Sequence, residues 1–269
     1  MRLGITMFAT DLSMPVHDLA RAAEERGFSS IYLPEHTHIP VSRRTAPATG
    51  DDVLPEQYQR TLDPLVALAA AVPVTSTITL GTGILLAAQR EPIVTAKAIA
   101  TLDHISGGRI AVGIGFGWNV EEIENHGVGY GSRRDVARRN VLAMRALWTQ
   151  EEASFEGFEP SWSWPKPRSG PPVYLGGAAG PKLFAHVAEY CDGWIPIGGK
   201  GIRAALPALR EACEKAERPM ARVIPFGSRP TPGKLEYYAS LGIEEVVATL
   251  PSGPADTVLP MLDQYASLL

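Results

Sequence analysis

Short runs of β-branched and other apolar residues alternate along this chain with longer stretches whose apolar positions recur at helical spacing. Such runs predict strands, and helical spacing predicts helices with one buried face. The predicted strands are Arg2–Phe8, Ser30–Leu33, Thr77–Leu86, Arg109–Ile114, Val173–Leu175, Trp194–Ile197, Arg222–Phe226 and Val246–Leu250. The predicted helices are Pro15–Arg26, Pro64–Val72, Pro92–Ile105, Arg134–Trp148, Pro181–Tyr190, Ala204–Glu217, Lys234–Leu241 and Ala255–Leu268.

Strands that alternate with helices in this way are typical of a parallel sheet in an α/β protein. The count of eight strands favours a closed (β/α)8 TIM barrel over an open sheet, and the chain length suits one such barrel. We therefore expect a single TIM-barrel domain over residues 1–269. The pattern is interrupted by a long polar segment, Pro34–Thr61, and by a Trp- and Pro-rich segment, Phe155–Pro172, both interpreted as loops.

Composition narrows the class of protein. The 269 residues include 26 Gly and 23 Pro, which is rich in backbone breakers but below the level typical of disordered chains. The net charge of −4 argues against nucleic-acid and anionic-membrane partners. The two cysteines are too few for a disulfide framework, and neither a secretion signal nor a membrane span is visible. We expect a cytoplasmic protein, and a homodimer as the commonest oligomer.

Many of the glycines fall at the ends of predicted strands. Gly81 and Gly83 lie in the third strand, Gly113, Gly115 and Gly117 accompany the fourth, and pairs follow the fifth and sixth. The carboxyl ends of barrel strands form the active face, where glycine allows the backbone to approach a ligand closely. The pattern therefore predicts a ligand site at this end of the barrel.

Two segments are candidates for anion binding. Gly176-Gly177-Ala178-Ala179-Gly180 precedes the helix at Pro181, and free N–H groups at a helix start favour phosphate; an ordinary strand-to-helix turn is the alternative. Ser106-Gly107-Gly108-Arg109 is typical of a glycine helix end followed by a surface arginine, or of an arginine that binds phosphate or carboxylate. The Gly113–Trp118 segment does not match the dinucleotide fingerprint.

Side chains beyond the second and fourth strands are candidates for chemistry. His36 and His38 are too few to predict a metal site, so we expect no metal, and His36 is interpreted as a cofactor-facing imidazole or a hydrogen-bonded loop residue. Trp118 and Asn119 lie where an aromatic wall would border a flat ligand or simply cover the barrel. Arg90, Arg109, Arg133 and Arg134 are candidate partners for an anionic ligand.

Taken in order, several segments resemble the bacterial luciferase-like monooxygenase superfamily, most closely its coenzyme F420-dependent oxidoreductases. They are Gly81-Thr-Gly-Ile-Leu-Leu, Gln89-Arg, Ala100-Thr-Leu-Asp, Ser106-Gly-Gly-Arg, Gly115-Phe-Gly-Trp-Asn, Leu147-Trp, Gly176-Gly and Asp192-Gly-Trp-Ile-Pro. The resemblance covers nearly the whole chain. It implies a luciferase-like TIM barrel that binds a flavin or deazaflavin at the carboxyl ends of its strands.

The resemblance also implies roles for individual residues. Thr82, Gly83 and Ile84 would form a bulge behind the cofactor ring, often with a non-proline cis peptide. Arg109, Gly176 and Gly177, with the adjacent Ala178, would bind phosphate, and Trp118 and Asn119 would border the cofactor. His36 would lie near the reactive carbon of the deazaflavin, where hydride is transferred.

The sequence departs from the sugar-phosphate dehydrogenase branch of that superfamily. Trp118 stands where that branch has a proton-donating Glu, and Pro40 stands where it has a Trp. Ala179 replaces a common hydroxyl, and Arg138-Arg139 replaces a common acidic pair. These departures disfavour a sugar phosphate as substrate.

Three functions follow as hypotheses. The first is an F420-dependent oxidoreductase that transfers hydride between the deazaflavin and a small organic substrate. The second is an FMN-dependent luciferase-like monooxygenase. The third is a deazaflavin-binding protein without turnover, suggested by the missing carboxylate at Trp118.

Overall fold

The computed structural model describes residues 1–43, 45–46, 53–168 and 170–269. Its main sheet has the strand order β10-β11-β1-β2-β3-β4-β7-β8-β9, and every pairing in it is parallel. Strands β9 (Arg222–Val223) and β10 (Phe226–Ser228) are two parts of one extended segment, which pairs with β8 on one side and β11 on the other. The sheet therefore closes into a barrel, as predicted.

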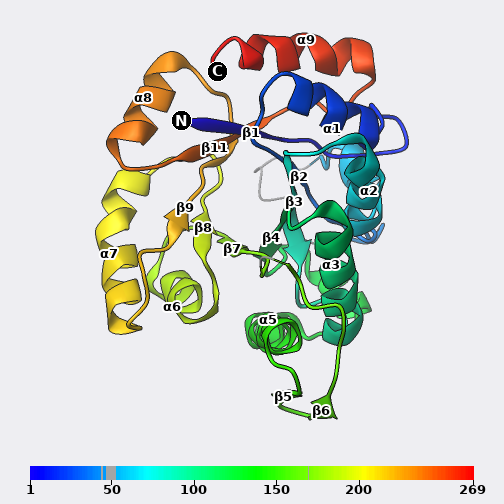
Figure 1. Ribbon diagram of the computed structural model, residues 1–269, viewed down its shortest axis with the longest axis vertical. Helices are drawn as coiled ribbons and strands as arrows, with labels where there is room; N and C mark the ends of the chain where they lie inside the picture. Colours follow the sequence, from blue (N-terminus) through cyan, green and yellow to red (C-terminus); the bar gives the residue numbers. More distant parts are fainter. Residues whose placement is uncertain (44, 47–52, 169) are drawn as a thin grey trace.

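The remaining elements alternate around this barrel (Figure 1). The first half contains β1 (Arg2–Thr6), α1 (Val16–Glu25), β2 (Ser30–Leu33), α2 (Pro64–Ala71), β3 (Thr79–Leu86), α3 (Pro92–Ser106), β4 (Ile110–Gly115), α4 (Val120–Asn125) and α5 (Arg133–Thr149). The second half contains β7 (Val173–Gly176), α6 (Pro181–Tyr190), β8 (Gly193–Ile195), α7 (Ile202–Lys215), α8 (Pro232–Ser240), β11 (Glu245–Thr249) and α9 (Ala255–Ala266). Three short 3-10 turns, at Glu56–Tyr58, Val72–Val74 and Tyr130–Ser132, lie between them.

Local sequence signals explain several helix boundaries. The Asp63 carboxylate accepts the N–H groups of Leu65 and Val66 at the start of α2, with Pro64 at the first helical position. Helix α3 ends at Gly107, whose φ of 76° is the left-handed conformation that glycine adopts most easily.

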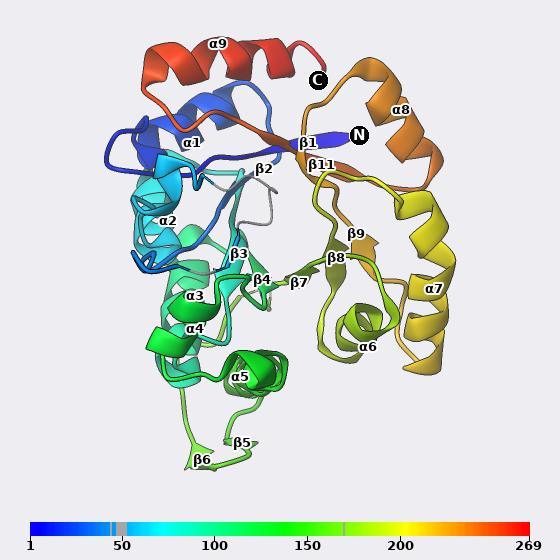
Figure 2. The same ribbon diagram turned by 180° about the vertical axis from the view of Figure 1, so that it is seen from behind.

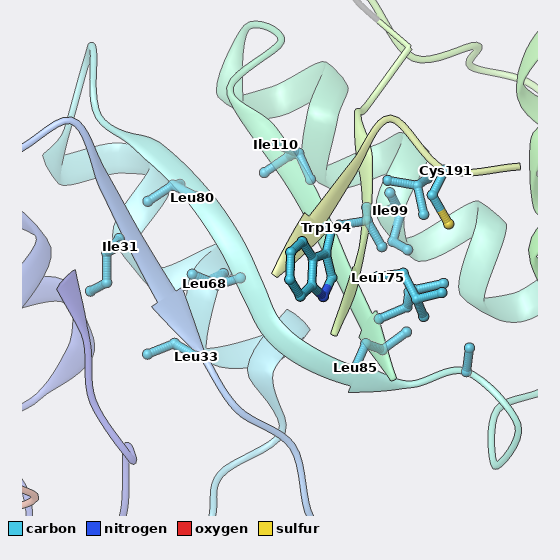
Figure 3. Close-up of a cluster of buried hydrophobic side chains, with 14 of the residues drawn as sticks. Ile31, Leu33, Leu68, Leu80, Leu85, Ile99, Ile110, Leu175, Cys191 and Trp194 are labelled. Carbon is cyan, nitrogen blue, oxygen red and sulfur yellow. The ribbon is translucent and has the colours of Figure 1, made fainter. Parts of the chain in front are cut away.

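The core has two layers. The larger one fills the space between the strands and the surrounding helices, and Figure 3 shows part of it, with Leu68 of α2 and Ile99 of α3 among strand residues such as Leu175. A smaller cluster fills the barrel interior, and its buried members are Tyr32, Ala111, Tyr174, Ile195, Ile224, Phe226 and Val247. Because strand side chains alternate between faces, Tyr32 points inward while Ile31 and Leu33 belong to the outer layer.

Three local predictions were wrong. Helix α4 was not predicted; it follows β4 along the chain and is labelled in Figure 2. The segment interpreted as a loop contains β6 (Phe158–Ser161), which pairs antiparallel with β5 (Ala153–Phe155) and stacks Phe155 on Phe158 at 4.4 Å. The predicted strand Arg222–Phe226 is interrupted between β9 and β10, where Pro225 follows Ile224 and has no N–H to donate.

Candidate functional site

The third strand carries a bulge at the carboxyl end of the barrel. The pairing of β3 with β4 changes register between Thr82 and Leu85, and the Gly83–Ile84 peptide is cis. The Thr82 hydroxyl donates to the carbonyl of Gly113 at 2.7 Å, so the bulge is fixed to the neighbouring strand. The bulge and its cis peptide lie where the resemblance implied them.

Ile84 extends from this bulge across the two strands that follow it in the sheet. A Cβ on Gly115 would overlap its Cδ1, and a Cβ on Gly176 would stand 3.2 Å from its Cγ2. Glycine at both positions therefore gives Ile84 the room to lie over β4 and β7. Its side chain is only partly buried, so it presents an apolar surface at the barrel end.

Glu35 clamps the other side of the bulge. Its backbone N–H donates to the carbonyl of Ile84 at 3.1 Å, and its carboxylate accepts the N–H of Leu86 at 2.6 Å. The guanidinium of Arg90 donates to the same carboxylate and to Asp63. Arg90 is therefore engaged in holding the site together, rather than being an open partner for an anionic ligand.

The turn after β7 leads directly into α6. Gly177 has a φ of +152°, and its carbonyl accepts the indole N–H of Trp194 at 2.9 Å. Gly180 is the N-cap of α6 and provides no side-chain hydrogen bond, while Ala178 is exposed. The first N–H groups of α6 are therefore left without a side-chain cap at the end of the barrel where Ile84 lies.

His36 follows β2 at the same end of the barrel and is bound to a buried carboxylate. Its Nδ1 lies 2.7 Å from Oε2 of Glu122 in α4, and the two residues are 8% and 1% exposed. The other carboxylate oxygen, Oε1, accepts the backbone N–H of Thr37 at 3.1 Å. Asn119 caps α4 by accepting the N–H of Glu122 at 3.3 Å, and no described residue pairs with its buried Nδ2.

Aromatic rings surround this imidazole. The ring of Tyr58 lies 5.2 Å from His36 and 4.7 Å from Phe8, and Trp118 lies edge-on to His36 at 5.9 Å. Burial raises the pKa of the Tyr58 phenol, so it stays protonated. The imidazole is thus held between an acid and an aromatic wall.

The structure overturns the expectation for Arg109. This residue precedes β4 and therefore lies at the amino end of the barrel, away from the other candidates. Its guanidinium is part-buried and donates to the carbonyls of Ser106 and Ile78 and to the hydroxyl of Thr75. Burial lowers its pKa, but its role here is to satisfy carbonyl groups of the chain, not to bind phosphate.

The other two candidate arginines contact aromatic rings. Arg133 stacks on Tyr130 at 3.6 Å and donates to the carbonyl of that residue, and Arg134 lies over Phe116 at 5.1 Å. Arg90 and Arg109 are thus bound to groups of the chain itself, while an anion-binding role for Arg133 and Arg134 stays a prediction.

The sequence analysis missed Glu122 and Tyr58. One signal for Glu122 was present, because Asn119-Val-Glu-Glu122 has the Asn-x-x-Glu spacing of a helix start. Tyr58 lies within the segment interpreted as a long loop, part of which, residues 44 and 47–52, lies outside the described residues. No short-range signal connects Tyr58 to His36.

The described residues hold neither a cluster of metal ligands nor a membrane-spanning helix. No group of three or more His, Cys, Asp or Glu side chains is placed to hold a metal ion. No helix in the described ranges has the length and apolar character to cross a membrane.

A closed (β/α)8 barrel with a strand-three bulge, and with the His36–Glu122 pair at the same end, defines the class of protein. Residues 14–231 match the family model of luciferase-like monooxygenases. The chain belongs to this family, and its fold is the luciferase-like TIM barrel that the sequence predicted.

Two relatives illustrate the range of the family. An uncharacterised protein of Mycobacterium tuberculosis is 44% identical over 278 residues, which cover 100% of this chain and 99% of the relative. An F420-dependent glucose-6-phosphate dehydrogenase of Nakamurella multipartita is 31% identical over 221 residues, covering 75% of this chain and 58% of the relative.

Two solved structures share the fold. The monooxygenase RslO1 from Streptomyces bottropensis superposes with a TM-score of 0.79 at 19% identity, covering 100% of this chain and 98% of that one. An F420-dependent secondary alcohol dehydrogenase superposes with a TM-score of 0.77 at 17% identity, with the same coverage.

Proposed function

We propose that this chain is an F420-dependent oxidoreductase that transfers a hydride between the deazaflavin and a small organic substrate. The observation that carries the proposal is the convergence of Ile84, the start of α6 and the His36–Glu122 pair at one end of the barrel. The family supplies the context, since its members include relatives named as F420-dependent dehydrogenases.

The residues present fit such a cofactor. The partly buried Ile84 offers an apolar platform for a flat ring, supported by Thr82 and Gly83. The uncapped start of α6, reached through Gly176, Gly177 and Ala178, fits a phosphate, because its N–H groups and dipole favour an anion.

When bound, the deazaflavin supplies the hydride chemistry, and the protein provides orientation and electrostatics. His36 would hold the proton that a substrate hydroxyl releases on oxidation, or return it to a carbonyl on reduction. Trp118 and Tyr58 would exclude water from that position, and Asn119 would keep α4 and Glu122 in place.

The His36–Glu122 pair favours turnover over simple cofactor binding. A deazaflavin-binding protein without turnover was suggested by the lack of a carboxylate at position 118, but Glu122 brings one to His36. An FMN-dependent monooxygenase stays the alternative cofactor hypothesis, because the same platform and helix start would accept FMN. The proposal treats residues 1–269 as one domain, while homodimerisation and a cytoplasmic location stay predictions of the sequence.

The test is a titration of the purified protein with oxidised F420, followed by the fluorescence of the deazaflavin, with FMN titrated in parallel. We expect binding at micromolar F420 and reduction of the bound cofactor by a member of a panel of small alcohols. The deazaflavin chromophore without its phosphate-bearing chain is the control and should bind more weakly. Tight binding of FMN with none of F420 would overturn the proposal.

A further inference from the structure

We propose that Glu122 is a positioning residue that fixes the tautomer of His36 and leaves its Nε2 as the working atom. The proposal rests on the proposed function for its chemical consequence, but the tautomer itself is a property of the protein alone. His36 and Glu122 come from different parts of the chain, the end of β2 and the start of α4, so only the fold brings them together.

The hydrogen bond between His36 and Glu122 determines which imidazole nitrogen carries the hydrogen. An ionised carboxylate only accepts hydrogen bonds, so the imidazole must donate from Nδ1 to Oε2 of Glu122 across their 2.7 Å separation. The second oxygen of Glu122 accepts the N–H of Thr37, which fixes the orientation of the carboxylate plane. In neutral His36 the Nε2 atom therefore carries a lone pair, and none of the described residues makes a hydrogen bond to it.

The hydrogen bonds of Glu122 to the segment after β2 replace the one that a glutamate at its position in a helix commonly makes. Glutamate three residues after a cap such as Asn119 commonly folds back to the cap's own N–H. Here both carboxylate oxygens are instead directed to His36 and Thr37. The Glu122 side chain therefore binds residues of the segment after β2, and not the N-terminus of its own helix.

Helix α4 is held against that segment at its other end as well. His126, at the end of α4, lies 2.7 Å from the hydroxyl of Thr37, and Asn125 lies 2.9 Å from Nε2 of His38. These contacts tie the helix at both ends, so Glu122 has little freedom to leave His36. A tautomer set by such a rigid contact is pre-organised before any ligand arrives.

The consequence for the proposed reaction is a defined path for one proton. With oxidised deazaflavin bound, an alcohol would give up its C–H hydride, with the electron pair, to the cofactor, and its hydroxyl proton to Nε2 of His36. The substrate would become a carbonyl compound, and the imidazole would become an imidazolium that keeps its Nδ1 hydrogen bond to Glu122. This hydrogen bond would stabilise the new charge on the ring. Reduction runs through the same atoms in reverse.

The test compares Glu122→Gln with Glu121→Gln, a matched change of the adjacent buried residue, whose carboxylate accepts the Thr45 hydroxyl and is not the hydrogen-bond partner of His36. The first readout is the 15N NMR spectrum of labelled histidine in the cofactor-free protein. We expect the wild type and Glu121→Gln to show His36 protonated on Nδ1 alone when neutral. Glu122→Gln should show a mixture of tautomers, because an amide can both donate and accept.

The second readout is steady-state kinetics with F420 and a substrate identified in the alcohol panel. We expect Glu122→Gln to lower kcat by about 100- to 1,000-fold, within the range of general acid–base contributions, with little change in KM or F420 affinity. Glu121→Gln should match the wild type.

The outcomes separate the two proposals. A wild-type His36 protonated on Nε2 overturns the inference, and this measurement decides it even if Glu122→Gln fails to fold. A folded Glu122→Gln variant with an unchanged tautomer and unchanged kcat overturns it as well. Absence of any F420 binding would refute the proposed function while leaving the tautomer result intact.

Discussion

The Cδ1 atom of Ile84 occupies the space that a Cβ on Gly115 would need. Gly115 has no positive φ, so alanine suits its backbone, and the effect of Gly115→Ala must come through Ile84. We expect the displaced Ile84 to weaken F420 binding by about tenfold, or about 1.4 kcal/mol. Stability should fall by about 1–3 kcal/mol, as is usual for overpacking. Fluorescence titration and urea unfolding measure the two effects.

The matched control is Gly233→Ala in α8, where an added Cβ meets nothing within 4 Å. It should leave F420 affinity unchanged. Equal affinity of Gly115→Ala and wild type would count against Ile84 as the platform for the ring.

Arg109 is predicted to stabilise the fold without touching the cofactor. Lysine keeps the charge but loses the planar fork that reaches Ser106, Thr75 and Ile78 together. We expect Arg109→Lys to lower the free energy of unfolding by about 2–3 kcal/mol, since hydrogen bonds from charged groups contribute about 1.5–3 kcal/mol each. Urea unfolding gives the stability, and F420 titration should give a wild-type dissociation constant.

Arg139→Lys, on the exposed side of α5, is the control and should be neutral in both assays. A loss of F420 affinity in Arg109→Lys, with stability retained, would restore the phosphate role that the structure contradicts.

The contrast between Arg109 and Glu122 shows what the sequence can predict. Alternation of elements predicted the barrel, because each strand and helix carries its own apolar period. The same order places His36, Ile84 and Gly176 at one end, since all three lie at or near the carboxyl ends of parallel strands. The order of elements also places Arg109 at the opposite end of the barrel, because Arg109 directly precedes β4. The phosphate-binding role that the resemblance implied for Arg109 therefore conflicted with the predicted topology.

Glu122 could not be assigned from the sequence, because its partner is 86 residues away and α4 has only 6 residues. A helix this short has too few turns for a clear apolar period. Tyr58 is similar, since it reaches His36 from an irregular segment. Contacts of this kind depend on the three-dimensional path of loops, which local propensity does not determine.

Acid sensitivity is predicted from Glu24, whose carboxylate accepts the N–H groups of Ser76, Thr77 and Ile78. Burial alone would raise its pKa, but these hydrogen bonds lower it from 4.5 to about 2. A lowered folded-state pKa gives stability that is complete above the unfolded value and is lost as the pH falls through the folded one. The loss therefore falls between about pH 4.5 and pH 2.

Because Glu24 is partly exposed to solvent, its contribution should be only about 1 kcal/mol. Urea unfolding of the wild type and of Glu24→Gln at neutral pH and at about pH 3 measures it. The variant should be less stable at neutral pH and should lose less stability on acidification. Parallel pH dependence of the two proteins would contradict the assignment.

The hydrogen bond from Trp194 to Gly177 is predicted to hold the turn at residues 176–180, the proposed phosphate site, in its binding conformation. Trp194→Phe keeps an aromatic ring but removes the indole N–H, so the turn before α6 loses its anchor. We expect F420 affinity to fall by about fivefold or more, or about 1 kcal/mol, the usual contribution of one hydrogen bond. Affinity for the chromophore that lacks the phosphate-bearing chain should be unchanged, because Ile84 is not disturbed.

The ratio of the two dissociation constants, from fluorescence titration, is the measurement. Phe184→Leu is the control, since the Phe184 ring packs on Trp194 at 5.1 Å and only its backbone N–H bonds to the turn, at Gly180, which leucine retains. It should lower stability and leave the ratio at its wild-type value. If Trp194→Phe weakens the binding of F420 and of the chromophore equally, the turn does not bind phosphate, and the start of α6 is not the anion site.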